Sequence, residues 1–316
     1  MEIADVKNLA DTIRQNIEKV IIGKTDEINL ILSALFAEGH VLLDDVPGTG
    51  KTMLAKTLAR SVDCGFGRIQ FTPDLLPTDL TGINYFNQKT SDFVFRKGAL
   101  FTNILLADEI NRATPRTQSG LLESMEEKQI TVDGQTHRLD EPYFVIATQN
   151  PIETQGTYPL PEAQLDRFLI RLSLGYPTTV ESADIIRRFL QGQPLEDIGP
   201  VCRTADLLEI RKAVKTVFVH DELLGYIVEL TEKTRAKDSV VLGVSTRGAI
   251  ALTNLCRAYA ALSGRTYVLP DDVQLLLPYA YAHRIIIRGG PAGHASDMLR
   301  DVITETKVPS ENYRGT

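Results

Sequence analysis

The stretch Val46-Pro47-Gly48-Thr49-Gly50-Lys51-Thr52 decides the fold predicted for this chain. It follows the short apolar run Val41-Leu42-Leu43 and opens a predicted helix, so it joins a strand to a helix. A glycine-rich turn in this setting presents backbone N–H groups at a helix N-terminus, where a phosphate chain binds. We expect Lys51 to reach the outer phosphates of a nucleotide and the Thr52 hydroxyl to bind Mg²⁺. The predicted phosphate loop comprises Val46, Pro47, Gly48, Thr49, Gly50, Lys51 and Thr52.

Asp45, directly before this stretch, departs from the usual motif, which has glycine at that position. Aspartate tolerates unusual backbone angles, but its carboxylate would lie close to bound phosphates and repel them. We therefore expect the Asp45→Gly substitution to tighten nucleotide binding. Unchanged or weaker binding would mean that the Asp45 carboxylate is paired with another group.

Two carboxylates follow a second apolar run. Ile104-Leu105-Leu106-Ala107 is typical of a buried strand, and Asp108-Glu109 comes directly after it. Ligands of open α/β sheets bind at the carboxyl ends of the strands. We expect Asp108 to bind the metal ion and Glu109 to orient and deprotonate the attacking water. An Asp-Glu pair alone is more often a solvated turn, but together with the phosphate loop it indicates nucleotide hydrolysis.

Three further polar residues are candidates for the same chemistry. Asn150 follows the apolar run 143–147 and either contacts the γ-phosphate or its water, or only forms a turn before Pro151. Arg167 is a candidate for the same site, or it is only an exposed charge at a helix end. Arg247 stands in the first turn of a predicted helix, where a cation opposes the helix dipole, so we expect an anion nearby. That anion is either a nucleotide phosphate or an Asp or Glu side chain.

Short apolar runs alternate with helical patterns in the first half of the chain. This order predicts a doubly wound α/β domain with a parallel sheet. The predicted strands are 41–43, 68–71, 104–107, 143–147 and 168–170.

Two predicted hairpins interrupt this order. One lies within Gly82–Lys97, and the other spans Gln129–Thr136 with Asp133-Gly134 as its turn. The first hairpin carries more aromatic residues than a short solvated hairpin needs, namely Tyr85, Phe86, Phe93 and Phe95. We expect them to contact another subunit or a client protein; packing onto the α/β core is the alternative.

The composition changes after Tyr176-Pro177. Glycine and proline residues between 191 and 200 indicate a linker, and the apolar residues beyond it recur at helical spacing. We therefore predict two domains: an α/β core over residues 1–190 and a smaller all-α domain over residues 191–316.

The composition is that of a folded globular chain of 316 residues, with 43% hydrophobic and 24% charged residues. No apolar run approaches the roughly 18 residues of a membrane-spanning helix, and the N-terminus lacks the features of a signal peptide. Three widely spaced cysteines, Cys64, Cys202 and Cys256, favour a reducing, cytoplasmic location. The net charge of −7 counts against a dedicated nucleic-acid-binding protein.

These motifs as a set resemble the AAA+ ATPases and, more closely, the MoxR family. The resemblance covers nearly the whole chain and implies a P-loop AAA+ core with a helical lid. The two hairpins would be the helix-2 insert and the hairpin before the first sensor. The matching motifs include Asp108-Glu109-Ile110-Asn111-Arg112-Ala113, Thr148-Gln149-Asn150-Pro151, Asp166-Arg167-Phe168 and Ser245-Thr246-Arg247.

The resemblance also implies roles for single residues. Asn150 would be the first sensor, and Arg247 would be the second sensor. Arg167 would be the arginine finger that acts on the neighbouring subunit. The residues beside the adenine would be Ile21, Ile22 and Gly23.

The function implied by the resemblance is that of a homo-hexameric ring that binds ATP and Mg²⁺. Such rings hydrolyse ATP to mature or remodel client proteins, often with a von Willebrand factor A domain partner. One alternative is a DNA-acting relative similar to minichromosome-maintenance helicases, against which the acidic net charge counts. The other alternative is a nucleotide-gated binding module that hydrolyses ATP slowly. The carboxylate of Asp45 is the feature that leaves this alternative open.

Overall fold

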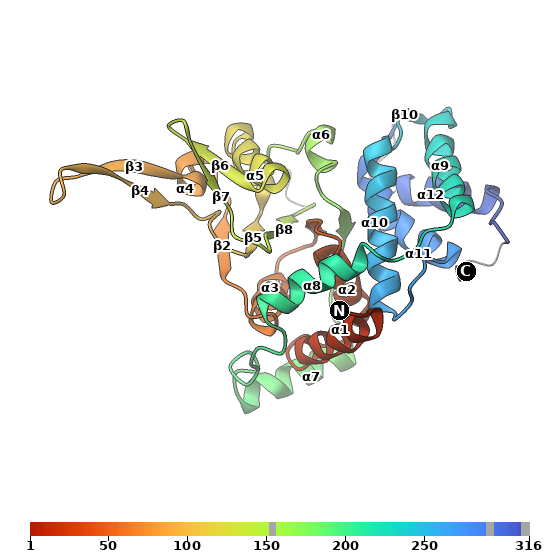
Figure 1. The fold of residues 1–316 in the computed structure, drawn as a ribbon, viewed down its shortest axis with the longest axis horizontal. Helices are drawn as coiled ribbons and strands as arrows, with labels where there is room; N and C mark the ends of the chain where they lie inside the picture. Colours follow the sequence, from red (N-terminus) through yellow and green to blue (C-terminus); the bar gives the residue numbers. More distant parts are fainter. Residues whose placement is uncertain (152–155, 289–293, 311–316) are drawn as a thin grey trace.

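The computed structural model describes residues 1–151, 156–288 and 294–310, and it is built around a five-stranded sheet (Figure 1). Every pairing in this sheet is parallel, and the strand order is β2-β5-β8-β1-β9. The predicted parallel sheet is therefore confirmed, although its last strand begins two residues later than expected. The strands are β1 (Val41–Asp44), β2 (Phe66–Gln70), β5 (Ile104–Asp108), β8 (Phe144–Gln149) and β9 (Ile170–Leu172).

Alternate residues of each central strand enter two different cores, as the pleat of a strand requires. Val41 and Leu43 of β1 join the larger core, whereas Leu42 joins the smaller one. The larger core also contains residues of α1 (Ile3–Glu18), α2 (Thr25–Phe36) and α3 (Lys51–Ser61). The smaller core is formed with α5 (Pro115–Glu127) and the short elements around it, which are α4 (Pro77–Thr81), η1 (Ile110–Arg112) and α6 (Glu162–Leu165).

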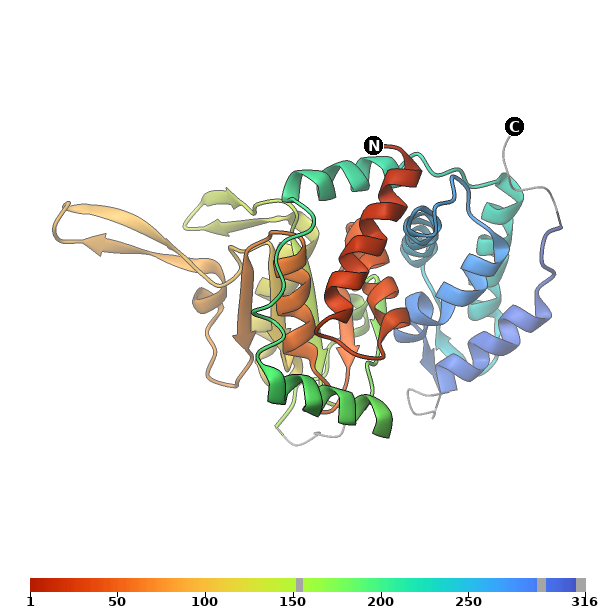
Figure 2. The ribbon, with the colours of Figure 1, turned by 90° about the horizontal axis from the view of Figure 1, so that it is seen from below.

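Both predicted hairpins are present. The pair β3 (Gly82–Asn87) and β4 (Asp92–Lys97) projects far from the rest of the molecule in both views (Figures 1 and 2). The pair β6 (Gln129–Val132) and β7 (Gln135–Arg138) lies beside it. Asp133 and Gly134 have φ values of +51° and +80°, which is the geometry of a two-residue type I′ hairpin turn.

Helices dominate the remainder of the chain. Helix α10 (Thr246–Leu262) packs on both α1 and α2, so the N-terminal helices lie between the sheet and the C-terminal helices (Figure 2). A short antiparallel ladder, β10 (Val240–Leu242) with β11 (Ile286–Ile287), adds to the helices that the sequence indicates. No helix of the described residues is long and apolar enough to cross a membrane. The helices are α7 (Thr179–Gln191), α8 (Thr204–Val214), α9 (Asp221–Ala236), α10 (Thr246–Leu262), α11 (Pro270–Tyr281), η2 (Ala282–Arg284) and α12 (His294–Glu305).

The aromatic residues of the long hairpin divide into two groups, and Tyr85, which is 42% exposed, belongs with the exposed one. Phe86 and Phe93 are 53% and 69% exposed and contact each other edge to face, with ring centroids 5.4 Å apart. Phe95 instead stacks on His137 of the second hairpin at 4.0 Å and meets Phe101 edge to face. Packing therefore accounts for Phe95, whereas Phe86 and Phe93 remain available for contacts with other molecules.

Replacing these rings should separate the two groups. Phe95→Ala should lower the free energy of unfolding by about 1–3 kcal/mol, because it removes a partly buried ring and its stack on His137. Phe93→Ala should change the free energy of unfolding by less than about 0.5 kcal/mol, because its ring is exposed. Urea unfolding of both variants measures this, and equal losses would show that the stack on His137 adds no stability.

Candidate active site

The phosphate loop joins β1 to α3, and two glycines set its path. Gly48 and Gly50 have φ values of +89° and +90°, which side-chain-bearing residues rarely adopt. Gly50 is the residue before α3, and Lys51 is the first residue of the helix. The loop thereby ends at a helix N-terminus, where free backbone N–H groups and the helix dipole attract an anion.

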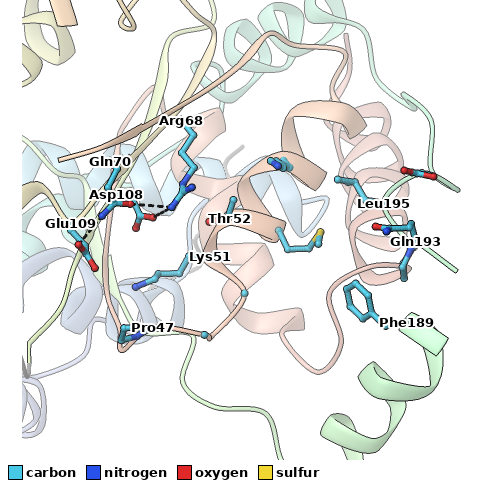
Figure 3. Close-up of a pocket in the computed structure, with 16 residues that line it drawn as sticks. Pro47, Lys51, Thr52, Arg68, Gln70, Asp108, Glu109, Phe189, Gln193 and Leu195 are labelled. Carbon is cyan, nitrogen blue, oxygen red and sulfur yellow. Dashed lines mark hydrogen bonds and ion pairs between the residues drawn. The ribbon is translucent and has the colours of Figure 1, made fainter. Parts of the chain in front are cut away.

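A cavity of about 630 Å³ opens above this loop (Figure 3). It brings together Lys51 and Thr52 from the start of α3 with Asp108 and Glu109 from the end of β5, as the sequence predicts. The other lining residues come from the loop, α3, β2 and the end and following segment of α7: Pro47, Gly48, Gly50, Met53, Lys56, Arg68, Gln70, Phe189, Gln193, Pro194, Leu195 and Glu196.

Asp108 is held from both sides. Its Oδ1 accepts a hydrogen bond from the Thr148 hydroxyl at 2.7 Å, and its Oδ2 forms an ion pair with Arg68 at 2.7 Å. The Thr148 hydroxyl also accepts a hydrogen bond from the backbone N–H of Glu109 at 2.9 Å. Thr148 lies near the end of β8, so this one side chain ties the end of β5 to the neighbouring strand.

Glu109 is also restrained. Its Oε2 accepts a hydrogen bond from the Gln70 amide at 2.7 Å and pairs with Arg112 at 3.0 Å. The backbone of Glu109 is left-handed, with φ of +55°, a strained conformation for a residue with a side chain. The carboxylate is therefore fixed by its neighbours on β2 and η1 as well as by its own backbone.

Sequence reasoning missed Arg68 and Gln70. Both lie on β2, two residues apart and hence on one face of the strand, and Gln70 stands opposite Asp108 in the register. The sequence signal that could have identified these two residues is a pair of polar side chains at alternate positions near the carboxyl end of a predicted strand. The apolar neighbours Ile69 and Phe71 concealed it, because they made the run look like an ordinary buried strand.

Asp45 does not point a free carboxylate at the phosphate site. Its side chain is 3% exposed and accepts hydrogen bonds from the Ser173 hydroxyl (2.7 Å) and the backbone N–H groups of Leu174 (2.8 Å) and Gly175 (3.0 Å). Its backbone carbonyl accepts a hydrogen bond from Lys51 Nζ at 3.0 Å. The expectation of an unpaired carboxylate that repels phosphates is therefore wrong, because the carboxylate anchors the loop to the segment after β9.

A second, mostly apolar cavity of about 280 Å³ adjoins the phosphate loop and shares Gly48, Gly50, Met53 and Phe189 with the first. Ile21 and Ile22, predicted beside the adenine, line it together with Pro177 and Ile185. Gly23 is not among the lining residues. Its φ is +70°, and a Cβ added there would lie 1.9 Å from a carboxylate oxygen of Glu181 on α7. The positive φ is the feature that favours glycine here, because the Glu181 carboxylate ends a flexible side chain that can move aside.

Asn150 directly follows β8, the strand between β5 and β1. It stands at the sheet edge where the phosphate loop and the carboxylate pair also lie. It is not among the lining residues of the 630 Å³ cavity. The structure therefore places the backbone of Asn150 at the site, and the role of its side chain is a proposal.

Arg167 and Arg247 lie together, away from the phosphate loop. Both pair with Glu126 of α5, at 3.1 Å each, through its two carboxylate oxygens. Arg247 also lies 3.9 Å from Asp166, which forms an ion pair with the buried Arg284 at 2.6 Å. The anion expected beside Arg247 is thus Glu126 within this chain.

These arginines line a separate cavity of about 360 Å³, which has no lining residue in common with the 630 Å³ cavity among residues 1–151, 156–288 and 294–310. Their side chains are 29% and 52% exposed. His40 lines the same cavity; burial lowers its pKa to about 4, so it is neutral at physiological pH. Its Nδ1 accepts from the Val145 N–H, so Nε2 donates to the Met125 carbonyl. The two arginines at this cavity are therefore partly exposed and share the Glu126 carboxylate, and a neutral histidine lines the same cavity.

The parallel sheet and the phosphate loop with its facing carboxylates define a P-loop nucleotide-binding protein. Residues 40–170 match the model of the ATPase family associated with various cellular activities (AAA), and residues 232–306 match the AAA lid domain. A crystal structure from Cytophaga hutchinsonii, provisionally described as an ATPase, aligns with a TM-score of 0.89 at 37% identity, over 97% of this chain and 96% of that one.

Two relatives narrow the class. Chaperone MoxR1 of Mycobacterium tuberculosis is 40% identical over 86% of this chain and 74% of its own length. Uncharacterized protein YeaC of Bacillus subtilis is 49% identical over 93% of both chains. The chain belongs to the MoxR family of AAA+ ATPases, with the P-loop α/β fold and a C-terminal helical lid. Neither the helicase-like alternative nor the slow binding module is favoured by these relatives.

The pairing of Asp45 reverses the expectation for its substitution. Asp45→Gly removes three hydrogen bonds to a buried carboxylate and leaves two backbone N–H groups without an acceptor, so it should destabilise the protein by about 2–4 kcal/mol. ATP binding should weaken, because the loop loses its anchor. Asp45→Asn keeps one acceptor oxygen and should show a smaller loss. Thermal unfolding and nucleotide titration measure both effects, and tighter ATP binding by the Asp45→Gly variant would contradict this account.

Proposed function

We propose that the 630 Å³ cavity binds and hydrolyses ATP. The observation that carries the proposal is the arrangement of Lys51 and Thr52 opposite Asp108 and Glu109 across one cavity, at the end of a glycine-rich loop (Figure 3). The adjoining apolar cavity, lined by Ile21 and Ile22, suits a flat base such as adenine. Phosphates on the loop would place the base in this second cavity, since both cavities share Gly48 and Gly50.

The residues present fit a magnesium ion. Thr52 and Asp108 line the same cavity and offer hard oxygen donors. Mg²⁺ in nucleotide sites typically takes one or two protein oxygens and completes its shell with phosphates and waters. When bound, the ion would neutralise phosphate charge and orient the γ-phosphate.

The chain's own residues divide the remaining work. Lys51 exchanges the Asp45 carbonyl for phosphate oxygens and neutralises their charge. Glu109 orients the attacking water and accepts its proton, once its carboxylate turns from Gln70 and Arg112. Asn150, at the same sheet edge, serves as the first sensor of the γ-phosphate.

Arg167 acts as the arginine finger on the nucleotide of a neighbouring subunit, and Arg247, the second sensor, lies beside it. The support is their position: both are partly exposed, both line a cavity separate from the phosphate loop, and both share Glu126. A cation that meets the γ-phosphate as charge develops stabilises the transition state, and an arginine finger accelerates hydrolysis on the order of 10³–10⁵-fold. This arrangement requires an assembly in which one face meets another, and we propose the homo-hexameric ring.

Hydrolysis would drive maturation or remodelling of client proteins. The similarity to Chaperone MoxR1 supports a chaperone-like role. The exposed aromatic residues of the β3–β4 hairpin are the proposed contact with clients, and a von Willebrand factor A domain protein is the proposed partner. Residues 1–190 would form the core, and residues 191–316 the lid that moves against it. A cytoplasmic location stays a prediction from the three widely spaced cysteines.

Substitutions of Lys51 and Glu109 should separate ATP binding from ATP hydrolysis. Lys51→Ala should lose ATP binding by at least about tenfold, because it removes a charge that contacts the phosphates in the ground state. Glu109→Gln should bind ATP nearly as well as the wild type but hydrolyse it at least about a hundredfold more slowly, because it cannot accept the proton from water. Titration with a fluorescent ATP analogue and phosphate-release assays measure both properties. Equal loss of ATP binding in the two variants would contradict these roles.

A double substitution tests whether the exposed rings of the β3–β4 hairpin contact client proteins. The double variant Phe86→Ser/Phe93→Ser should keep the ATPase rate within about twofold of the wild type, because both rings are exposed and far from the cavity. It should lose most of its ability to suppress the heat-induced aggregation of a model client. Lys89→Ser, at the turn of the same hairpin, is the matched control and should retain suppression. Full suppression by the double variant would exclude these rings as the client contact.

A further inference from the structure

A single nitrogen atom of Arg68 makes two contacts in the 630 Å³ cavity (Figure 3). Its Nη2 donates hydrogen bonds to Oδ2 of Asp108 at 2.7 Å and to Oε1 of Gln70 at 3.0 Å. A terminal guanidinium nitrogen carries two N–H groups, so these two acceptors use both of them. Asp108 and Gln70 therefore share one donor atom, and Nη2 cannot leave the first without also moving relative to the second.

The contact with Arg68 also fixes the direction in which the Gln70 amide faces. A guanidinium only donates hydrogen bonds and a carboxylate only accepts them, so the amide must turn its oxygen to Arg68 and its nitrogen to Glu109. Nε2 of Gln70 accordingly donates to Oε2 of Glu109 at 2.7 Å. One chain of hydrogen bonds thus runs from Asp108 through Arg68 and Gln70 to Glu109.

The two partners of the Arg68–Asp108 ion pair differ in their freedom to move. Arg68 stands on β2, the first strand in the order of the sheet, opposite Leu106 of β5. Its side chain is 46% exposed, whereas that of Asp108 is 13% exposed and is also held by the Thr148 hydroxyl. Arg68 is therefore the partner that can leave, while the carboxylate stays at the end of its strand.

The charge of Arg68 competes with a metal ion for Asp108. Asp108 and Glu109 are adjacent carboxylates, and Arg68 and Arg112 supply the cations that pair with them. A guanidinium and a divalent cation on the same carboxylate repel each other, so binding of the metal requires Arg68 to withdraw. Each contact that breaks on metal binding weakens the metal affinity, and removal of that contact by substitution must strengthen it.

We propose that Arg68 is a positioning residue that couples metal binding at Asp108 to the release of Glu109. This inference rests on the proposed function of the cavity. Arg68 withdraws from Asp108 when the Mg²⁺ of the nucleotide binds there, and its Nη2 leaves Gln70 in the same movement. The Gln70 amide then has no donor that fixes its orientation, and it is free to turn away from Glu109. The base is thus held back until the metal is in place.

The affinity of the full chain for Mn²⁺, with a non-hydrolysable ATP analogue bound, tests this coupling without a turnover measurement. Mn²⁺ takes the place of Mg²⁺ because electron paramagnetic resonance measures the free ion directly. Arg68→Met should tighten Mn²⁺ binding by at least about tenfold, because it removes the competing cation. Arg68→Lys keeps the charge and should stay within about threefold of the wild type. Lys56→Met, the matched control, removes an exposed cation of the same cavity and should tighten binding by less than about twofold.

Unfolding temperatures distinguish this role from a merely structural one. Without metal and nucleotide, Arg68→Met should unfold about 1–3 °C below the wild type, because the two carboxylates lose a neighbouring cation. With Mn²⁺ and the analogue bound, the difference should vanish or reverse, because Arg68 of the wild type has then withdrawn from Asp108. A deficit of the same size in both conditions would show that Arg68 only supports the fold and would overturn the proposal.

Gln70→Ala tests the shared nitrogen atom. It removes the second acceptor of Nη2 and should tighten Mn²⁺ binding by about twofold to fivefold, because one hydrogen bond fewer breaks when the metal binds. The double variant Arg68→Met/Gln70→Ala should match Arg68→Met alone, because Gln70 acts on the metal only through Arg68. Additive effects would refute the coupling. Equal Mn²⁺ affinity of the wild type and Arg68→Met, with the analogue bound to both, would refute the role of Arg68 and leave the proposed function intact, whereas a wild type that does not bind the analogue would refute both.

Discussion

The register of three parallel strands at one edge of the sheet is the constraint on which the site depends. In β8, Ala147 stands opposite both Leu42 of β1 and Ala107 of β5. The next residue of β8, Thr148, stands opposite Leu43 near the end of β1 and contacts Asp108 at the end of β5. Its hydroxyl contacts both the Asp108 carboxylate and the Glu109 backbone. A shift of one residue would turn Thr148 to the opposite face of the sheet and separate the carboxylates from their anchor.

Each charged group proposed to act on the nucleotide has a partner within the chain. Lys51 contacts the Asp45 carbonyl, Asp108 pairs with Arg68, and Glu109 is held by Gln70. Arg167 and Arg247 share the two oxygens of Glu126. Each of these groups must therefore exchange its partner within the chain for the nucleotide before catalysis. Only a ligand that offers better-placed charge moves the groups out of their resting contacts. Within one chain the two arginines are separated from the nucleotide site, because no described residue lines both their cavity and that of Lys51.

Local patterns predicted the sheet, both hairpins and the meeting of Lys51, Thr52, Asp108 and Glu109 at one cavity. The reason is physical: a glycine-rich turn between a strand and a helix, and two carboxylates after a buried strand, are short-range signals that need no tertiary information. The roles of Asp45, Arg68 and Glu126 cannot be predicted from such short-range signals. The acceptor role of Asp45 depends on residues 173–175, more than a hundred positions away, and Glu126 is one of several acidic residues on α5 until the fold brings Arg167 and Arg247 to it.

The central claim is that one chain carries two halves of different active sites, which assembly completes. The most direct measurement mixes equal amounts of Arg167→Ala and Glu109→Gln subunits, each inactive alone, and follows ATP hydrolysis. In random rings about a quarter of the interfaces combine an intact Glu109 with an intact Arg167 from the neighbour, so about a quarter of the wild-type rate should return. No recovery, with mixed rings demonstrated by native mass spectrometry, would place Arg167 in its own subunit's site or give it a purely structural role, and would contradict the account.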